Sequence, residues 1–231
     1  EIKNDFINNM THEFKTPIAT INLATDALNN EKVISNQEQI KYYSGIIKEE
    51  NRRMNKQVEK ILQSAQLERE EIKLQLKKID VHAIIEKVAE NVTLQLEEAN
   101  ATLETQFEAR NAWIEADEVH FSNILFNLID NAIKYSKENP FISITTINVG
   151  KDLQVQISDN GIGMSKETIH HIFEKFYRAH TGNLHNVKGF GLGLTYVKKI
   201  VDAHGGKIMV SSEPDKGTTF TLQFTSLQNL T

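Results

Sequence analysis

The sequence contains no cysteine among its 231 residues, and this absence excludes three kinds of chemistry. Disulfides, thiolate metal sites and a cysteine nucleophile are all ruled out, which is compatible with a reducing compartment. The sequence also has no uninterrupted run of about 18 apolar residues, so no segment is predicted to cross a membrane. It does not begin with methionine, however, so a membrane segment upstream of residue 1 is still possible.

Positive charge is not in excess either. The 26 Lys and Arg residues are outnumbered by 31 Asp and Glu residues, which gives a net charge of −5. Proteins that bind nucleic acids need concentrated Lys and Arg to displace counterions, so that class is set aside. A composition of 39% hydrophobic and 25% charged residues is ordinary for a globular protein, and the length allows one large domain or two smaller ones.

Glycine is nearly absent from the first half of the sequence. Only Gly45 precedes residue 150, and the other ten glycines lie from Gly150 onward. Glycine weakens helix interiors and is used in turns and phosphate-binding loops. The first half is therefore predicted to be mostly long helix, and the second half a mixed fold with functional loops.

The first 28 residues predict a helix with two different faces. Apolar residues recur along it at helical spacing: Phe6, Met10, Phe14, Ile18, Ile21 and Leu28. His12 points roughly 200° away from Met10 and Phe14, toward water or a partner. Taken alone, it is either an ordinary surface histidine or an imidazole kept free to react. Pro17 removes one backbone hydrogen bond and should bend the helix one turn beyond His12.

A second long helix is predicted after a polar connection at residues 29–36, with Ser35 or Asn36 as its cap. Its apolar residues recur every seven positions: Ile40, Ile47, Met54 and Ile61. Two helices of this length cannot cover their own apolar stripes. Pairing with a second copy into a four-helix bundle is therefore favoured, and the alternative is that the hairpin packs on its own second domain.

From about Ile79 the pattern becomes mixed. Helices are predicted at residues 81–96, 118–136 and 194–204, and strands at 102–107, 113–115, 141–149, 153–158, 207–212 and 218–225. Gly150 lies in a hairpin-like turn between two of these strands. The sum is an α+β fold in which helices cover a mixed sheet.

Two asparagines stand out in the apolar helix predicted at 118–136. Asn127 and Asn131 are four residues apart, so both amides project from one helix face. Amide oxygens suit Mg²⁺, which keeps most of its waters and shares phosphate oxygens with a nucleotide. Lys134 follows on the same helix and is a candidate phosphate contact.

Two glycine-containing segments complete the candidate nucleotide site. Asp159 ends a strand and is followed by Gly161 and Gly163, so a carboxylate is available to accept from an amino group such as adenine N6 while the glycines allow a ring to approach. Alternating glycines at 189, 191 and 193 open a helix, where backbone N–H groups cradle phosphate oxygens. The spacing is neither the Rossmann nor the Walker pattern.

The order of these pieces carries more information than any one of them. An Asn-rich helix, Asp-x-Gly-x-Gly, Phe173 with Phe176, Gly-x-Gly-x-Gly and a final Gly217-Thr218-Thr219 resemble the N, G1, F, G2 and last glycine boxes of sensor histidine kinases. His12-Glu13-x-x-Thr16-Pro17 resembles their H box. The resemblance implies a dimerisation and histidine phosphotransfer domain at residues 1–76, and an α/β sandwich that binds ATP at residues 79–226.

Carried over by position, the resemblance implies roles for individual residues. His12 is the expected phospho-acceptor, Glu13 its acid/base or orienting neighbour, Thr16 the position associated with dephosphorylating a partner, and Arg178 part of the ATP lid. Mg²⁺ is expected at Asn131, helped by Asn127. The expected ATP contacts are Asn127, Asn131, Lys134, Tyr135, Asp159, Gly161, Gly163, Lys188, Gly189, Gly191, Gly193 and Thr219.

The implied activity is ATP-dependent autophosphorylation on His12, followed by transfer to an aspartate in the receiver domain of a response regulator. The implied setting is a homodimer that forms the cytoplasmic portion of an inner-membrane sensor protein, with a membrane-spanning sensor region upstream. Two alternatives are left open. The protein acts mainly as a response-regulator phosphatase, or it is a dimeric ATP-binding scaffold without catalysis.

Overall fold

The structure is a computed structural model that describes residues 2–69, 72–177 and 191–227. By their contacts, these residues form two compact units. The first contains the helical hairpin of residues 2–69 and also groups Gly191 and Leu192, and the second is an α/β unit of residues 72–177 and 193–227. The two units are described separately below. The predicted domain boundaries, 1–76 and 79–226, stay predictions.

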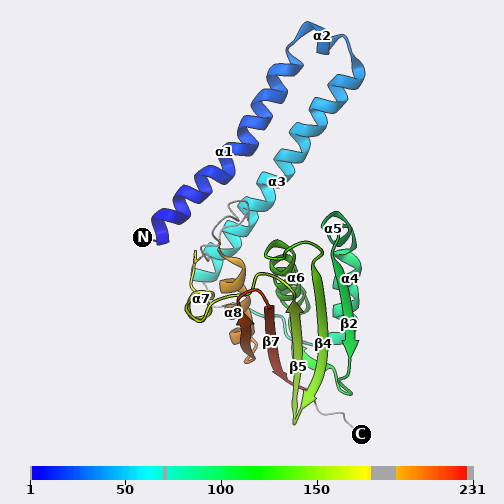
Figure 1. Ribbon diagram of the computed structural model, residues 1–231, viewed down its shortest axis with the longest axis vertical. Helices are drawn as coiled ribbons and strands as arrows, with labels where there is room; N and C mark the ends of the chain where they lie inside the picture. Colours follow the sequence, from blue (N-terminus) through cyan, green and yellow to red (C-terminus); the bar gives the residue numbers. More distant parts are fainter. Residues whose placement is uncertain (1, 70–71, 178–190, 228–231) are drawn as a thin grey trace. The chain divides into compact units, whose positions relative to one another are not determined.

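The hairpin consists of α1 (Ile2–Leu28) and α3 (Gln37–Arg69), which pack against each other as antiparallel helices (Figure 1). The predicted polar connection contains a short helix, α2 (Glu31–Ile34), which was not predicted. The Asn30 side chain accepts from Lys32 N and so caps α2. Asn36 accepts from the backbone N–H groups of Glu38 and Gln39 at the start of α3, as expected for one of the two predicted caps.

The face that α1 turns toward α3 differs in part from the predicted stripe. Pro17 and Ala24, which are seven residues apart, are buried, and Met10 and Phe14 are half-buried. Ile18 is 45% exposed, so within the hairpin it lies beside the face that contacts α3 and not on it. Successive residues on a helix differ by about 100° in direction, which turns Ile18 away when Pro17 faces α3.

The α/β unit is built on a five-stranded mixed sheet, as predicted. Its strands are β2 (Thr102–Phe107), β4 (Phe141–Val149), β5 (Asp152–Asp159), β6 (Lys207–Glu213) and β7 (Gly217–Thr225). Their order is β2-β4-β5-β7-β6, with β2 parallel to β4 and every other neighbouring pair antiparallel. Gly150, at φ +61°, makes the turn between β4 and β5.

Helices cover one face of this sheet (Figure 1). They are α4 (Val81–Asn91), α6 (Glu118–Lys134) and α8 (Gly193–Ala203), with the short α5 (Thr93–Glu98) after α4. The core between helices and sheet is apolar, and its largest fully buried side chains include Phe121, Leu125, Ile144, Leu153 and Ile200. Alternate residues of the central strands β4, β5 and β7 are buried, as expected for a sheet with one covered face. The helix predicted at 81–96 is interrupted at Val92, which ends α4.

Two elements of the α/β unit were not predicted from sequence patterns. Strand β1 (Lys77–Asp80) pairs with β3 (Trp113–Ala116) in a separate two-stranded antiparallel sheet, and β1 was not predicted. Helix α7 (Lys166–His171) was also not predicted. Both elements are short, so their periodicity is too brief to recognise.

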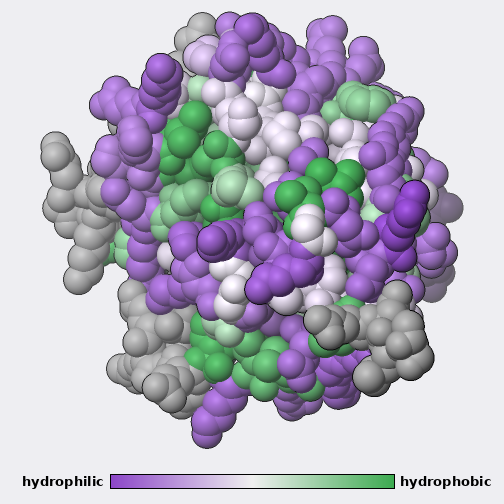
Figure 2. All heavy atoms as spheres, turned by 90° about the horizontal axis from the view of Figure 1, so that it is seen from below, coloured by the Kyte–Doolittle hydropathy of each residue, from purple (hydrophilic) through white to green (hydrophobic). Residues whose placement is uncertain are grey.

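Exposed apolar side chains are spread over the surface of the α/β unit. Among them are Trp113, Phe141, Val149 and Met209. Figure 2 shows hydrophobic residues on the lower face as separate patches among hydrophilic ones. Among the described residues, no helix has the length and hydropathy needed to span a membrane.

Candidate functional site

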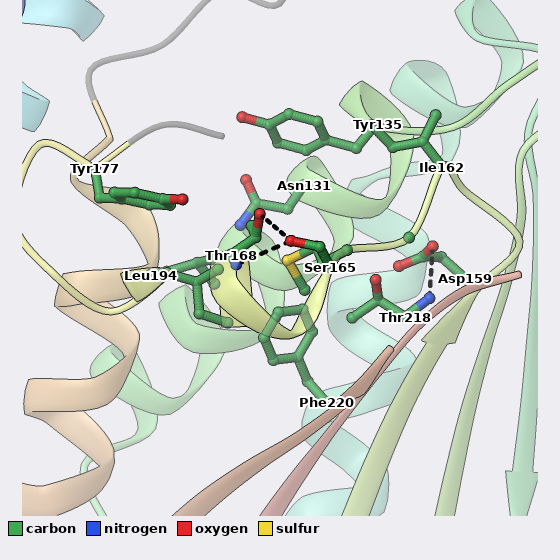
Figure 3. Close-up of a pocket in the computed structure, with 13 residues that line it drawn as sticks. Asn131, Tyr135, Asp159, Ile162, Ser165, Thr168, Tyr177, Leu194, Thr218 and Phe220 are labelled. Carbon is green, nitrogen blue, oxygen red and sulfur yellow. Dashed lines mark hydrogen bonds between the residues drawn. The ribbon is translucent and has the colours of Figure 1, made fainter. Parts of the chain in front are cut away.

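A pocket of about 290 Å³ opens in the α/β unit where β5 and β7 meet α6, α7 and the start of α8. Figure 3 shows Asp159 and Thr218 on one side of it, Tyr177 on the other, and Asn131 between them. The residues that line the pocket are Asn131, Tyr135, Asp159, Ile162, Gly163, Met164, Ser165, Thr168, Ile172, Tyr177, Leu194, Thr218 and Phe220.

Asp159 is the acidic residue in the pocket lining. Its Oδ1 accepts from the backbone N–H groups of Gly161 at 2.8 Å and Thr218 at 3.2 Å. Its Oδ2 accepts no hydrogen bond from the part of the chain that the structure describes, so this oxygen is available to a ligand. Burial raises the pKa of Asp159, although the two backbone donors oppose that rise. The carboxyl is therefore held in place at one oxygen and open at the other.

Gly163 allows the chain after Asp159 to pass close to the β6–β7 turn. Its φ is +64°, and a Cβ at this position would lie 1.8 Å from the carbonyl oxygen of Glu213. Asp215 N also donates to Ile162 O at 2.7 Å, so the two segments are joined by a backbone hydrogen bond. Only glycine fits this combination of backbone conformation and close approach.

Asn131 and Tyr135 come from the last turns of α6 and both line the pocket (Figure 3). The Asn131 amide makes no hydrogen bond within the described part of the chain and is free to bind a ligand. Asn127 does not line the pocket. Its Nδ2 donates to Asn123 O at 2.8 Å, and its Oδ1 lies where a Cβ on Gly193 would be only 2.9 Å away. Asn127 therefore packs against the start of α8, and its predicted ligand role stays a prediction.

Five other predicted ATP contacts among the described residues also lie outside the pocket lining, namely Lys134, Gly161, Gly191, Gly193 and Thr219. Lys134 forms an ion pair with Asp130, one turn earlier on α6. Thr219 is hydrogen-bonded to Ser158 across the β5–β7 ladder at 2.8 Å. Thr218, which pairs with Asp159, lines the pocket instead. Successive residues of a strand point to opposite faces of the sheet, so Thr219 does not line the pocket, and its role as an ATP contact stays a prediction.

The apolar part of the lining was not predicted. It includes Ile162, Met164, Ile172, Leu194 and Phe220, and in Figure 3 Phe220 lies at its base. Such residues look like ordinary core positions in a sequence. Ser165 had a recognisable signal, because Ser is a preferred N-cap residue, and Ser165 Oγ does accept from Thr168 N at 3.1 Å at the start of α7.

Part of the predicted site lies outside the described residues, namely Arg178, Lys188 and Gly189. Gly191 is described and has a φ of +68°, and Gly193 is the first residue of α8. The described lining contains no Lys or Arg. Of the cations expected beside the phosphates, Lys134 lies outside this lining, and Arg178 and Lys188 lie outside the described residues.

The predicted phospho-acceptor lies in the helical hairpin. His12 is exposed on α1, and Thr16, one turn later, is exposed as well. Thr16 Oγ1 donates to His12 O at 3.4 Å. Glu13 is half-buried and its Oε2 accepts from Gln57 Nε2 of α3 at 3.3 Å. The imidazole is thus open to solvent, and the neighbouring carboxylate is held by the second helix.

The pocket fits an adenine nucleotide in shape and chemistry. Apolar side chains provide surfaces for a flat ring, and Asp159 Oδ2 and Thr218 offer polar contacts at its edge. No group of three or more His, Asp or Glu side chains that could hold a metal occurs among the described residues. A divalent cation that is bound mainly by phosphate oxygens, water and the free Asn131 amide fits this donor set.

Comparisons with known proteins assign both units. Residues 2–70 match the His Kinase A (phospho-acceptor) domain, and residues 116–228 match the histidine kinase-, DNA gyrase B-, and HSP90-like ATPase family. Sensor protein RprX of Bacteroides fragilis is 46% identical over 231 residues, which are 99% of this chain and 44% of RprX. The chain thus spans less than half of that relative.

Solved structures show the same fold. Full-length ShkA in complex with AMPPNP covers 97% of this chain with a TM-score of 0.70 at 24% identity, and the match spans 46% of ShkA. Histidine kinase ThkA in complex with response regulator protein TrrA covers 96% of this chain with a TM-score of 0.68 at 24% identity, over 61% of that chain. With a phospho-acceptor domain followed by an ATPase domain, the chain belongs to the sensor histidine kinases.

Proposed function

We propose that this chain transfers the γ-phosphoryl group of ATP to His12 and then passes it to an aspartate of a response regulator. One observation carries the proposal. The same chain has an exposed imidazole in a phospho-acceptor domain and a separate pocket in its α/β unit. In that pocket the free Asp159 oxygen suits an adenine nucleotide, and the free Asn131 amide suits its cation. Family membership supports the same reaction.

The first step needs only groups that the chain and ATP supply. A neutral imidazole nitrogen of His12 provides the lone pair that forms the N–P bond. The bond between the γ-phosphorus and its bridging oxygen breaks, and ADP leaves with the electron pair. Glu13 accepts the N–H proton of the imidazole ring, or it orients the ring by accepting a hydrogen bond from that N–H group. Phosphoryl transfer depends mainly on positioning and charge neutralisation, so no further covalent help is required.

Asn131 is the described residue best placed to hold Mg²⁺, with Asn127 as the further candidate from the sequence. Mg²⁺, when bound, neutralises charge on the phosphate oxygens. Asp159 accepts a hydrogen bond from the adenine amino group, and Tyr135 lies beside the nucleotide. Arg178, Lys188 and Gly189 complete the proposal as phosphate contacts, together with Gly191 and the start of α8.

The proposed partners are a second copy of the chain and the receiver domain of a response regulator. ThkA forms a complex with a response regulator, which supports the second partner. The proposed location is the cytoplasmic portion of an inner-membrane sensor, and the description of RprX as a sensor protein supports it.

Labelling with γ-labelled ATP and Mg²⁺ tests the proposal. The protein should acquire acid-labile label, as expected for a phosphohistidine, and His12→Ala should abolish the label while ATP binding stays unchanged. Label that persists in His12→Ala would refute the assignment of the phospho-acceptor. ATP binding without any label in the wild type would favour the scaffold.

Mixed dimers distinguish transfer within one subunit from transfer between two. One subunit carries His12→Ala and the other Asn131→Ala, so the intact histidine and the intact ATP site lie on different chains. Label on the mixed dimer would show transfer between subunits, and its absence would show transfer within a subunit.

A response-regulator phosphatase is the second candidate function. Thr16 favours it, because its hydroxyl is exposed one turn beyond His12 on the same helix. Thr16→Ala should then lose dephosphorylation of the regulator and keep autophosphorylation. Equal loss of both activities would argue against a separate role for Thr16.

A further inference from the structure

Gln57 occupies an unusual position on α3. Tyr43, Glu50 and Gln57 are seven residues apart and form one half-buried row along the helix. The Oε1 atom of Gln57 is fully buried and has no hydrogen-bond partner among the described residues. A buried acceptor without a partner is unfavourable, whereas an apolar side chain would fit this row without that cost. The presence of glutamine therefore calls for another explanation.

The other end of the same amide supplies one. Gln57 Nε2 donates to Oε2 of Glu13 at 3.3 Å, across the hairpin and between residues 44 apart in sequence. The NH₂ group must face Glu13, because the reverse orientation would bring two acceptor oxygens together. The bond holds the half-buried carboxylate of Glu13. Glu13 directly follows His12 in sequence and lies three residues before the exposed Thr16.

We propose that Gln57 is a positioning residue for phosphoryl transfer to His12, acting through Glu13. The proposal rests on the function proposed above. By holding Oε2, the Gln57 amide fixes the Glu13 side chain and leaves Oε1 to accept the imidazole proton while the N–P bond forms and the bond to ADP breaks.

A purely structural role makes different predictions. If Gln57 only fixes the register of α1 on α3, its replacement should change the stability of the hairpin. It should also change the rate of His12 labelling by the same factor at every pH. If Gln57 positions Glu13, its replacement should change the pH dependence of the reaction. Stability and pH profile thus separate the two roles.

The experiment compares three substitutions in the full chain. Gln57→Met keeps the length of the side chain and removes both the donor and the unpartnered oxygen. Gln57→Glu puts a second carboxylate opposite Glu13. Gln39→Glu is the matched control, since Gln39 is an exposed glutamine at the start of the same helix. Rates of His12 labelling are measured in single turnover from about pH 6 to 9, together with KM for ATP and urea unfolding.

Gln57→Met should label more slowly by about tenfold, with unchanged KM and no loss of stability. Gln57→Glu should shift the acid limb of the pH profile to higher pH, because two carboxylates this close share a proton. Gln39→Glu should match the wild type. In a Glu13→Gln background, Gln57→Glu should no longer shift the acid limb of the pH profile. That result would show that the shift depends on Glu13.

The proposal is overturned if Gln57→Glu and Gln57→Met keep the wild-type profile and rate, or if they only scale it in step with a loss of stability. A limb shift that persists without Glu13 would also overturn it. These outcomes differ from failure of the proposed function, in which the wild type itself acquires no label on His12.

Discussion

Asp159 combines a fixed oxygen with a free one, and the two have different consequences for a substitution. Asn at this position keeps an oxygen for Gly161 N and Thr218 N but replaces the free acceptor by a donor. Asp159→Asn should therefore lower ATP affinity by about 10- to 100-fold, the value of one hydrogen bond to a charged group. Calorimetric titration with ATP measures the change. Asp152→Asn, at the other end of β5, should leave the affinity unaltered, and equal affinities in all three proteins would contradict the role given to Asp159.

The pKa of Asp159 gives the same substitution a second readout. Burial raises this pKa above 3.8 in the folded protein, so the folded chain binds more protons than the unfolded chain between the two values. The free energy of unfolding should then fall as the pH rises through that window. Asp159→Asn removes the contribution and should be no less stable than the wild type at neutral pH.

Gly163 and Gly150 allow two costs of substitution by alanine to be separated. One is the strain of a positive φ, and the other is the contact of a Cβ with nearby backbone atoms. Both have a positive φ, +64° and +61°, but of the two only Gly163 has backbone atoms within 4 Å of the position that a Cβ would occupy. Gly150→Ala should cost about 1–2 kcal/mol for the left-handed conformation alone. Gly163→Ala should cost about 1–3 kcal/mol more and weaken ATP binding. Urea unfolding measures both, and equal costs would show that the β6–β7 turn moves aside freely.

At the scale of elements, a polar cluster joins the start of α6, the end of α8 and the segment before β1. Asp117 caps α6 by accepting from Val119 N and His120 N, and its second oxygen accepts from Gln75 N. Asp117 N in turn donates to His204 Nε2 at 2.9 Å, while His204 Nδ1 donates to Ile200 O. Both ring nitrogens are therefore occupied in the neutral form, and a second ring proton would remove the acceptor for Asp117 N.

This geometry makes the α/β unit sensitive to acid. Burial lowers the pKa of His204 below 6.5, and His120 adds to the shift while Ile200 O and Asp117 oppose it. The unfolded chain then binds more protons, so the stabilisation is full above pH 6.5 and is lost as the pH falls toward the folded pKa. His204→Gln cannot titrate and should flatten the free energy of unfolding between about pH 6.5 and 5.5 in urea experiments. The slope that remains belongs to His82, whose pKa burial also lowers. An unchanged slope in His204→Gln would contradict this assignment.

The long elements could be predicted from sequence, and the short ones could not. α1, α6, β4 and β7 have clear periodicity, and the structure has them within a few residues of the expected bounds. β1 has four residues and exists because β3 pairs with it, which no local pattern reveals. The exposure of Ile18 within the hairpin has a similar cause, since the contact line on α1 depends on how α3 packs against it.

Polar site residues were easier to predict than apolar ones. Asp159 and Asn131 are conspicuous because carboxylate and amide groups need a reason to lie in apolar surroundings. Phe220 and Leu194 line the same pocket, yet nothing local separates them from core residues such as Leu222. Thr218, which lines the pocket, was not predicted, because the face on which a strand residue lies depends on the register of the strand with its neighbour.

At the scale of the whole molecule, the hairpin has an apolar side that its own two helices do not cover. Exposed apolar residues on it are Ile7, Ile18, Val58 and Leu62. On each helix they lie roughly 90° around the axis from the side that contacts the other helix, in the same sense of rotation. Because the helices are antiparallel, the same sense places both pairs on one side of the hairpin. That surface suits a second copy, which would complete a four-helix bundle.

Ile18→Glu tests this surface, since a dimer would then have to bury a charge from each subunit. The dissociation constant should rise by about 100-fold or more, as measured by sedimentation at micromolar concentrations. Leu23→Glu is the matched control. Leu23 is 71% exposed on the same helix, but it points roughly 140° away from Ile18, so the dimer should persist. A wild type that stays monomeric, or an Ile18→Glu variant that stays dimeric, would instead favour the alternative in which the hairpin covers its apolar side with its own second domain.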